Sequence, residues 1–174
     1  MAIRRFFLAA LAASALFFPQ VPASAGVTLE ERSLVDTNRS TPANGSYGGT
    51  DTRTLRTLVW APEAPCSEGG RCAPYPLLLM AHGMSGLPEA FDAFARTMAE
   101  AGYVVAAPAF PLTNASAPGG SQSGFPDTMN QPDDLVFVAS ELTAAAVSPT
   151  DGLFGRIATD SVTALGVSLG GATV

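Results

Sequence analysis

The sequence predicts an α/β fold, with a mostly parallel sheet and helices on both of its faces. Two observations indicate this fold. Short apolar runs alternate with segments of helical periodicity along most of the 174-residue chain, which is the pattern of strand–helix units in a parallel sheet. The last apolar run, 161–166, leads into Gly166-Val167-Ser168-Leu169-Gly170. A glycine-flanked serine of this form is typical of a sharp turn from a strand into a helix.

The first 25 residues have the pattern of a secretory signal peptide. Arg4 and Arg5 precede an apolar stretch, 6–18, and the segment ends in Ala23-Ser24-Ala25, a small-residue cleavage site. The apolar stretch of thirteen residues is short for a membrane span. We therefore expect cleavage before Gly26 and a secreted or periplasmic protein with no stable membrane span. An uncleaved membrane anchor is the alternative.

Short segments bounded by turn residues are predicted to be the strands of 26–174, which we expect to form a single domain. A loop rich in Gly, Ser, Thr and Asn follows the first run. The later runs are largely aliphatic, as in parallel strands buried between two layers of helices. The five predicted strands are 26–36, 53–60, 77–81, 103–107 and 161–166.

The first predicted helix covers 88–101 and ends at Gly102, a residue suited to the position after a helix. Four large apolar side chains recur at helical spacing, and we expect this stripe to pack against the sheet. They are Leu87, Phe91, Phe94 and Met98.

The second predicted helix covers 131–146. Pro132 suits its first turn, and Asp133 and Asp134 favour the positive end of the helix dipole. The side chains expected to point inward are Leu135, Val138, Ala139 and Leu142. Before this helix lies 110–127, which is rich in glycine and proline. It leaves the carboxyl end of a predicted strand, where open α/β sheets bind ligands, so we expect it to contact substrate.

Composition excludes several kinds of chemistry. All nine basic residues are arginine, which excludes a P-loop lysine, a Schiff-base lysine and a Ser–Lys dyad within this chain. One histidine and two cysteines are too few for the usual structural zinc site. The formal net charge is −6, and it becomes more negative once the two arginines of the leader are removed. We therefore expect no cofactor, no metal and no nucleic-acid partner.

The two cysteines, Cys66 and Cys72, enclose a short segment with a Gly-Gly turn. In an exported protein this spacing predicts a small disulfide that closes a hairpin-like loop. A redox pair or two free thiols are the alternatives.

A second motif, His82-Gly83-Met84-Ser85-Gly86, follows the strand 77–81. Such a loop can present a backbone N–H, that of Met84, to a carbonyl attacked by Ser168, and the N–H of Leu169 would supply the second donor of an oxyanion hole. Together with the strands before and between them, the two motifs resemble the α/β-hydrolase family. The resemblance is to secreted dienelactone-hydrolase-like esterases, chlorophyllases and the platelet-activating-factor acetylhydrolase type, and it runs from about Arg53 onward.

This resemblance implies an α/β-hydrolase fold in which Ser168 is the nucleophile of a Ser-His-Asp/Glu triad that hydrolyses carboxylic esters. In the family the acid and the histidine follow the serine, so both would lie beyond Val174. Residues 26–174 would then be the N-terminal portion of one domain, incomplete at the C-terminus. The substrate would be a small-molecule, lipid or polymer ester. Lactone or amide hydrolysis at the same site, and a non-catalytic binding or scaffold domain, are the alternatives.

Without later strands, part of the apolar face near the serine would be uncovered, at Val162, Leu165 and Val167.

His82 is the only histidine of the chain. It precedes Ser168, whereas the base of the family follows the serine. We therefore expect His82 and Gly83 to support the oxyanion loop through hydrogen bonds to nearby backbone; a role as catalytic base is the alternative. Five aspartates also precede the serine and are not expected to be the triad acid: Asp127, Asp133, Asp134, Asp151 and Asp160.

Overall fold

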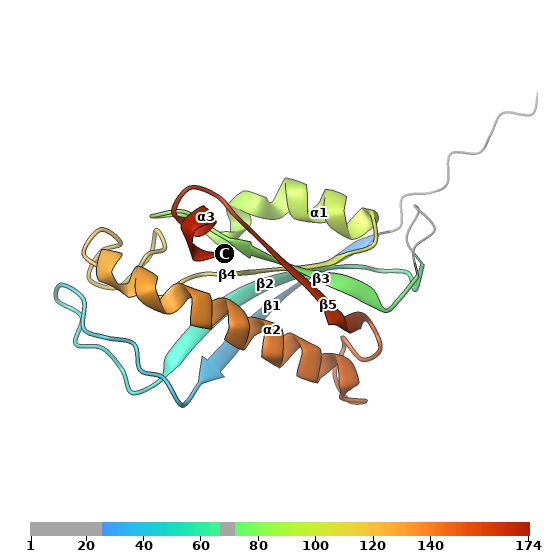
Figure 1. Ribbon diagram of the computed structural model, residues 1–174, viewed down its shortest axis with the longest axis horizontal. Coiled ribbons are helices and arrows are strands. Elements are labelled where there is room, and N and C mark those ends of the chain that lie inside the picture. The colour runs from blue at the N-terminus through green and yellow to red at the C-terminus, as the bar shows by residue number, and fades with distance from the viewer. Residues whose placement is uncertain (1–25, 67–71) are drawn as a thin grey trace, which may run out of the picture.

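The computed structural model describes residues 26–66 and 72–174, so the predicted signal peptide, 1–25, lies outside the described residues. The described residues form a five-stranded sheet with the strand order β1-β2-β4-β3-β5 (Figure 1). Its strands are β1 (Val27–Asp36), β2 (Arg53–Pro62), β3 (Tyr75–Ala81), β4 (Val104–Pro108) and β5 (Ile157–Gly166). Each of them overlaps one of the five predicted strands.

Four of these five strands run in the same direction. β3 pairs in parallel with β4 and with β5, whereas β2 is antiparallel to both of its neighbours, β1 and β4. The mostly parallel sheet is therefore confirmed, with β2 as its reversed strand. Because β3, β4 and β5 end at the same edge of the sheet, the segments that follow them leave this edge together.

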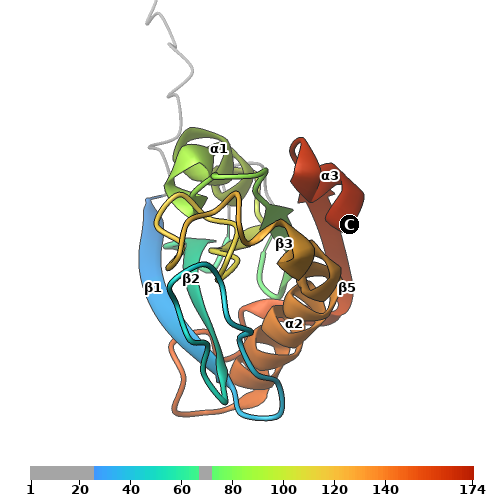
Figure 2. The same ribbon diagram turned by 90° about the vertical axis from the view of Figure 1, so that its left-hand side faces the viewer.

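Helices cover both faces of the sheet, as predicted (Figure 1 and Figure 2). On one face, α1 (Asp92–Glu100) and the short 3-10 helix η1 (Pro88–Phe91) before it pack against Leu58 and Trp60 of β2. On the other face, α2 (Gln131–Val147) packs against Leu55 and Val59 of the same strand. Successive side chains of a strand point to opposite faces, so each central strand contributes to two apolar cores.

The stripe of α1 that faces the sheet differs from the predicted stripe. Phe91, Ala95 and Ala99 are buried, whereas Phe94 is 44% exposed, so the prediction that Phe94 packs against the sheet is wrong. The helix rests on the sheet through its two small alanines, and Phe94 lies about 60° around the helix from Phe91, on the side away from them. The predicted end is correct, since Gly102 has a φ of 87° and its N–H donates to the Ala99 carbonyl at 2.9 Å.

β5 forms one edge of the described sheet. Its predicted parallel pairing is confirmed, but its predicted burial is not, since Val162 is 43% exposed and Leu165 is 38% exposed. The reason is that β5 pairs only with β3, and no described element covers its outer side. The expectation that apolar residues near the serine are partly uncovered is met, because Val167 is also 52% exposed.

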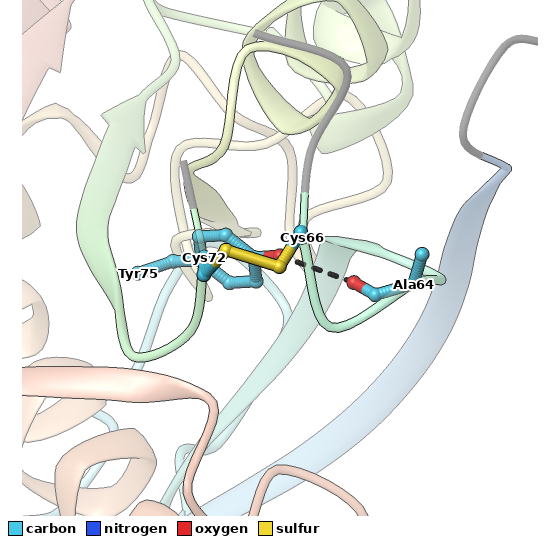
Figure 3. The surroundings of a disulfide bond; sticks show 4 residues. All are labelled: Ala64, Cys66, Cys72 and Tyr75. Carbon is cyan, nitrogen blue, oxygen red and sulfur yellow. Dashed lines mark hydrogen bonds between the residues drawn. A yellow bond between two sulfur atoms is a disulfide. The ribbon is translucent and has the colours of Figure 1, made fainter. Parts of the chain in front are cut away.

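The predicted disulfide is present between Cys66 and Cys72, whose Cα atoms are 3.9 Å apart (Figure 3). It links the chain shortly after β2 to the chain shortly before β3. Beside it, the buried Tyr75 hydroxyl donates to the Ala64 carbonyl at 3.1 Å. Both ends of the disulfide loop are thus fixed near the start of β3.

Within 26–66 and 72–174, no helix is long and apolar enough to cross a membrane.

Candidate active site

Ser168 has a backbone conformation that L-residues rarely adopt. Its φ and ψ are 55° and −121°, and it joins the end of β5 to the start of α3 (Leu169–Thr173). Among the described residues, Ser85 is the only other non-glycine residue with a positive φ. A backbone of this kind costs on the order of 1–3 kcal/mol and persists mainly at functional sites. The sharp strand-to-helix turn predicted from the sequence is therefore present.

The glycines of the motif make this turn possible. A Cβ atom at Gly166 would overlap the carbonyl oxygen of Gly170, and a Cβ atom at Gly170 would overlap the carbonyl oxygen of Ala81. The turn thus packs backbone against backbone, both on itself and on the end of β3. The Val167 N–H also donates to the Ala81 carbonyl at 3.1 Å, which holds Ser168 beside the loop that follows β3.

Gly83 of that loop contacts Ser168. A Cβ atom at position 83 would lie 3.0 Å from the Ser168 Cβ and 3.5 Å from its Oγ. Any larger residue would therefore crowd the serine side chain. Ser168 itself is exposed, so its hydroxyl is open to a substrate on the side away from Gly83.

The backbone N–H groups of Met84 and Leu169 have no hydrogen-bond partner within the described part of the chain, and the same holds for those of Gly83 and Ser168. Two later N–H groups of the loop are bonded: Ser85 donates to the Thr113 carbonyl at 2.7 Å, and Gly86 donates to the Gly83 carbonyl at 2.9 Å. Leu169 begins α3, where N–H groups lack an acceptor within the helix. Met84 and Leu169 are the two predicted oxyanion donors, and this role stays a prediction.

His82 is buried at the root of this loop and uses both ring nitrogens. Nε2 accepts the Phe110 N–H at 3.0 Å, so Nδ1 carries the proton and donates to the Gly83 carbonyl at 2.7 Å. The ring lies 4.8 Å, centroid to centroid, from the Phe110 ring. Burial lowers the pKa of His82 more than the bond to Gly83 raises it, so the imidazole is neutral at pH 7. Neither nitrogen is left to accept a proton from Ser168.

A buried ion cluster, which the sequence analysis missed, lies at the start of β2. The Arg53 guanidinium, 1% exposed, binds Asp127 at 2.8 and 3.0 Å and Asp134 at 2.6 and 2.7 Å. Arg39 also donates to Asp134 at 2.9 Å. From the sequence, Asp134 was expected only to favour the positive end of the helix dipole. No local pattern indicates that Arg53, some eighty positions earlier, lies beside it. Both carboxylates thus bind arginine, and neither forms a hydrogen bond with His82.

A second missed feature is a chain of hydrogen bonds through the side chain of Gln131, which is fully buried. Its Nε2 donates to the Thr113 Oγ1 at 2.7 Å, and its Oε1 accepts from the Thr173 hydroxyl at 2.6 Å. The sequence indicated that a helix starts at Gln131 but did not indicate that its side chain is buried, because glutamine is usually exposed.

A cleft of about 530 Å³ opens at the same edge of the sheet, between the segment before β2 and the segment after β4. Ser168 does not line it, because β4 and β3 lie between β2 and β5. The segment 110–127, predicted to contact substrate, forms part of its wall through Pro111, Asn114, Ser116 and Pro118. That contact stays a prediction.

Two solved structures show which fold this is. A ferulic acid esterase from Streptomyces cinnamoneus is similar with a TM-score of 0.62 and 20% sequence identity, over 87% of this chain and 55% of the esterase chain. A protein of Klebsiella pneumoniae subsp. pneumoniae, assigned as a dienelactone hydrolase, is similar with a TM-score of 0.52 and 17% identity, over 83% of this chain and 51% of that chain. No family model matches the sequence, and no curated protein matches it.

The described residues therefore have the α/β-hydrolase fold, and the predicted resemblance to dienelactone-hydrolase-like proteins is confirmed at the level of the fold. The chain spans about half the length of the two solved structures.

Proposed function

From the α/β-hydrolase fold and the serine at its strand-to-helix turn, we propose that this protein is a serine hydrolase of carboxylic esters, with Ser168 as nucleophile. The observation that carries the proposal is the arrangement at one sheet edge. An exposed serine with φ of 55° contacts the loop of Gly83, and the N–H groups of Met84 and Leu169 are free of partners among the described residues. A nucleophile and two donors for a developing oxyanion are what acyl transfer requires.

In the proposed reaction, the Ser168 Oγ attacks the ester carbonyl carbon while a base removes the hydroxyl proton. The carbonyl oxygen takes up the negative charge and accepts hydrogen bonds from the Met84 and Leu169 N–H groups. The carbon–oxygen bond to the alcohol then breaks, and the base returns its proton to the departing alcohol oxygen. Water, activated by the same base, finally hydrolyses the acyl-serine.

We assign the base to a histidine that follows Val174 in the reading frame, oriented by an Asp or Glu that also follows it. His82 is the only histidine of the present chain, and both of its nitrogens are bonded to backbone atoms. Its proposed role, with Gly83, is to support the oxyanion loop. A non-catalytic binding domain is the second candidate, because the described residues offer Ser168 no free histidine.

The ester substrate is proposed to be a small molecule, a lipid or a polymer, and the enzyme is proposed to hydrolyse it outside the cytoplasm. The Cys66–Cys72 disulfide supports a secreted or periplasmic location, since disulfides persist in oxidising compartments. The proposed signal peptide, 1–25, would direct the export of the protein from the cytoplasm.

The test uses the extended chain, meaning this sequence followed by whatever its reading frame encodes after Val174. Turnover of a short-chain chromogenic ester should fall by several orders of magnitude in Ser168→Ala. Ser161→Ala is the matched control, because Ser161 is exposed on the same strand and should leave turnover unchanged. Residues 26–174 alone should show no serine-dependent turnover.

Full activity of the extended Ser168→Ala enzyme would refute the nucleophile assignment. Turnover by residues 26–174 that is abolished by Ser168→Ala would instead place the base within this chain, at His82. Absence of any turnover or labelling by serine-directed reagents in the extended chain would favour the binding domain.

A further inference from the structure

We propose that Gln131 is a positioning residue that holds the two donors of the oxyanion hole in register. The inference rests on the proposed function, since it concerns the donors Met84 and Leu169. These donors belong to different parts of the fold: Met84 lies in the loop after β3, and Leu169 begins α3 after β5. The hole works only if both N–H groups point at one oxygen atom, so the spacing between loop and helix must be fixed.

On the loop side, the contact runs through Thr113. The Ser85 N–H, next to Met84, donates to the Thr113 carbonyl at 2.7 Å. Two further bonds join the same segments. One is a backbone bond from the Ala115 N–H to the Gly86 carbonyl at 3.1 Å, and the other runs from the Phe110 N–H to the His82 side chain, at Nε2, at 3.0 Å. Three hydrogen bonds therefore hold the loop against the segment 110–115.

On the helix side, the contact runs through Thr173. Its hydroxyl reaches the Gln131 Oε1 at 2.6 Å and lies 3.3 Å from the carbonyl oxygen of Leu169. Thr173 is four residues after Leu169 and thus lies one turn further along the same short helix. Fixing Thr173 therefore fixes the direction in which the helix, and the Leu169 N–H at its start, points.

Gln131 joins the two sides. Its amide donates to the Thr113 hydroxyl at 2.7 Å and accepts from Thr173, and its backbone is held at the start of α2, a helix of 17 residues. All three side chains are buried, Gln131 and Thr113 completely and Thr173 to 8% exposure. An amide suits this place because it donates at one end and accepts at the other. An apolar side chain of equal length would leave two buried hydroxyls without these partners.

The test is Gln131→Met in the extended chain, with kinetics expressed per active site titrated by a fluorophosphonate. Titration removes the effect of unfolded enzyme. We expect kcat to fall by about tenfold to a hundredfold, less than the loss of one oxyanion donor, while KM changes by less than about threefold, because the hole acts on the transition state. Thr57→Val is the matched control. It removes another completely buried polar group, which bonds the Leu55 carbonyl, and its kcat per titrated site should equal that of the wild type.

A second variant covers the case in which Gln131→Met does not fold. Thr173→Val alone should lower kcat per site in the same direction, since it breaks the same chain of bonds. Where Gln131→Met does fold, adding Thr173→Val to it should cause little further loss. An unchanged kcat in Gln131→Met, or in Thr173→Val where Gln131→Met does not fold, would overturn the inference, and so would an equal fall in Thr57→Val. If Ser168→Ala retains full activity, the proposed function fails; if Ser168 is essential but Gln131→Met has wild-type kcat, only the present inference fails.

Discussion

Replacing Arg53 by methionine should destabilise the extended chain by about 3–5 kcal/mol, because breaking a buried ion pair leaves an uncompensated buried charge. The structure gives the reason for this size. Arg53 makes four charged hydrogen bonds to Asp127 and Asp134, and all three side chains are at most 1% exposed. After the change Asp134 keeps Arg39, whereas the Asp127 carboxylate keeps, among the described residues, only the amide of Asn130.

The measurement is urea unfolding of the wild type and of two arginine-to-methionine variants. Arg96 is the matched control, since it pairs with Asp92 at 3.0 Å on the exposed side of α1 and is 42% exposed. An exposed pair of this kind contributes little, so Arg96→Met should cost less than about 1 kcal/mol. A loss below about 1 kcal/mol in Arg53→Met, or equal losses in the two variants, would refute the argument from burial. If Arg53→Met does not fold, Arg53→Lys is the variant to measure, because it keeps the charge but not the paired geometry. Its free energy of unfolding should still be clearly lower than that of the wild type.

Three further predictions concern other parts of the chain. Thiol titration of unreduced, denatured protein should find no free thiol, and removing both Cys66 and Cys72 should cost about 2 kcal/mol, because the closed loop is short; two free thiols in protein made by an oxidising route would contradict this. Burial lowers the pKa of His82, so the unfolded chain binds its proton more readily; the resulting stability is complete above about pH 6.5 and is lost as the pH falls. The melting temperature should therefore drop less between pH 7 and pH 5 in His82→Gln than in the wild type, and equal drops would count against a neutral buried imidazole. Intact mass of the exported protein should show Gly26 as its first residue, and membrane-bound protein that retains the leader would show an anchor instead.

The elements of the fold could be predicted because each is specified locally. Short segments between turn residues indicated all five strands, and Pro132 and Gly102 marked helix ends whose backbone requirements depend on single residues. The turn at Ser168 was likewise predictable, since only glycine leaves room on both sides of it.

What could not be predicted depends on contacts between distant segments. Phe94 satisfied the helical spacing but lies at the border of the packed face, which is set by how closely the helix approaches the sheet. Arg53 and Gln131 have ordinary polar neighbours in the sequence, and their partners are brought to them only by the folded sheet and helices. Their burial is a property of the tertiary structure, so no local pattern indicated it.

If the proposed function is correct, Ser168 becomes acylated during turnover. The direct measurement is to stop the reaction of the extended chain while it hydrolyses a chromogenic ester and to locate the added mass by peptide mass spectrometry. Protein that has reacted with a fluorophosphonate is measured in the same way. We expect the added mass on Ser168, in the peptide that follows Arg156, and we expect no label and no turnover in Ser168→Ala. An active enzyme that carries the acyl group on another residue, or that hydrolyses the ester without Ser168, would show that Ser168 is not the nucleophile.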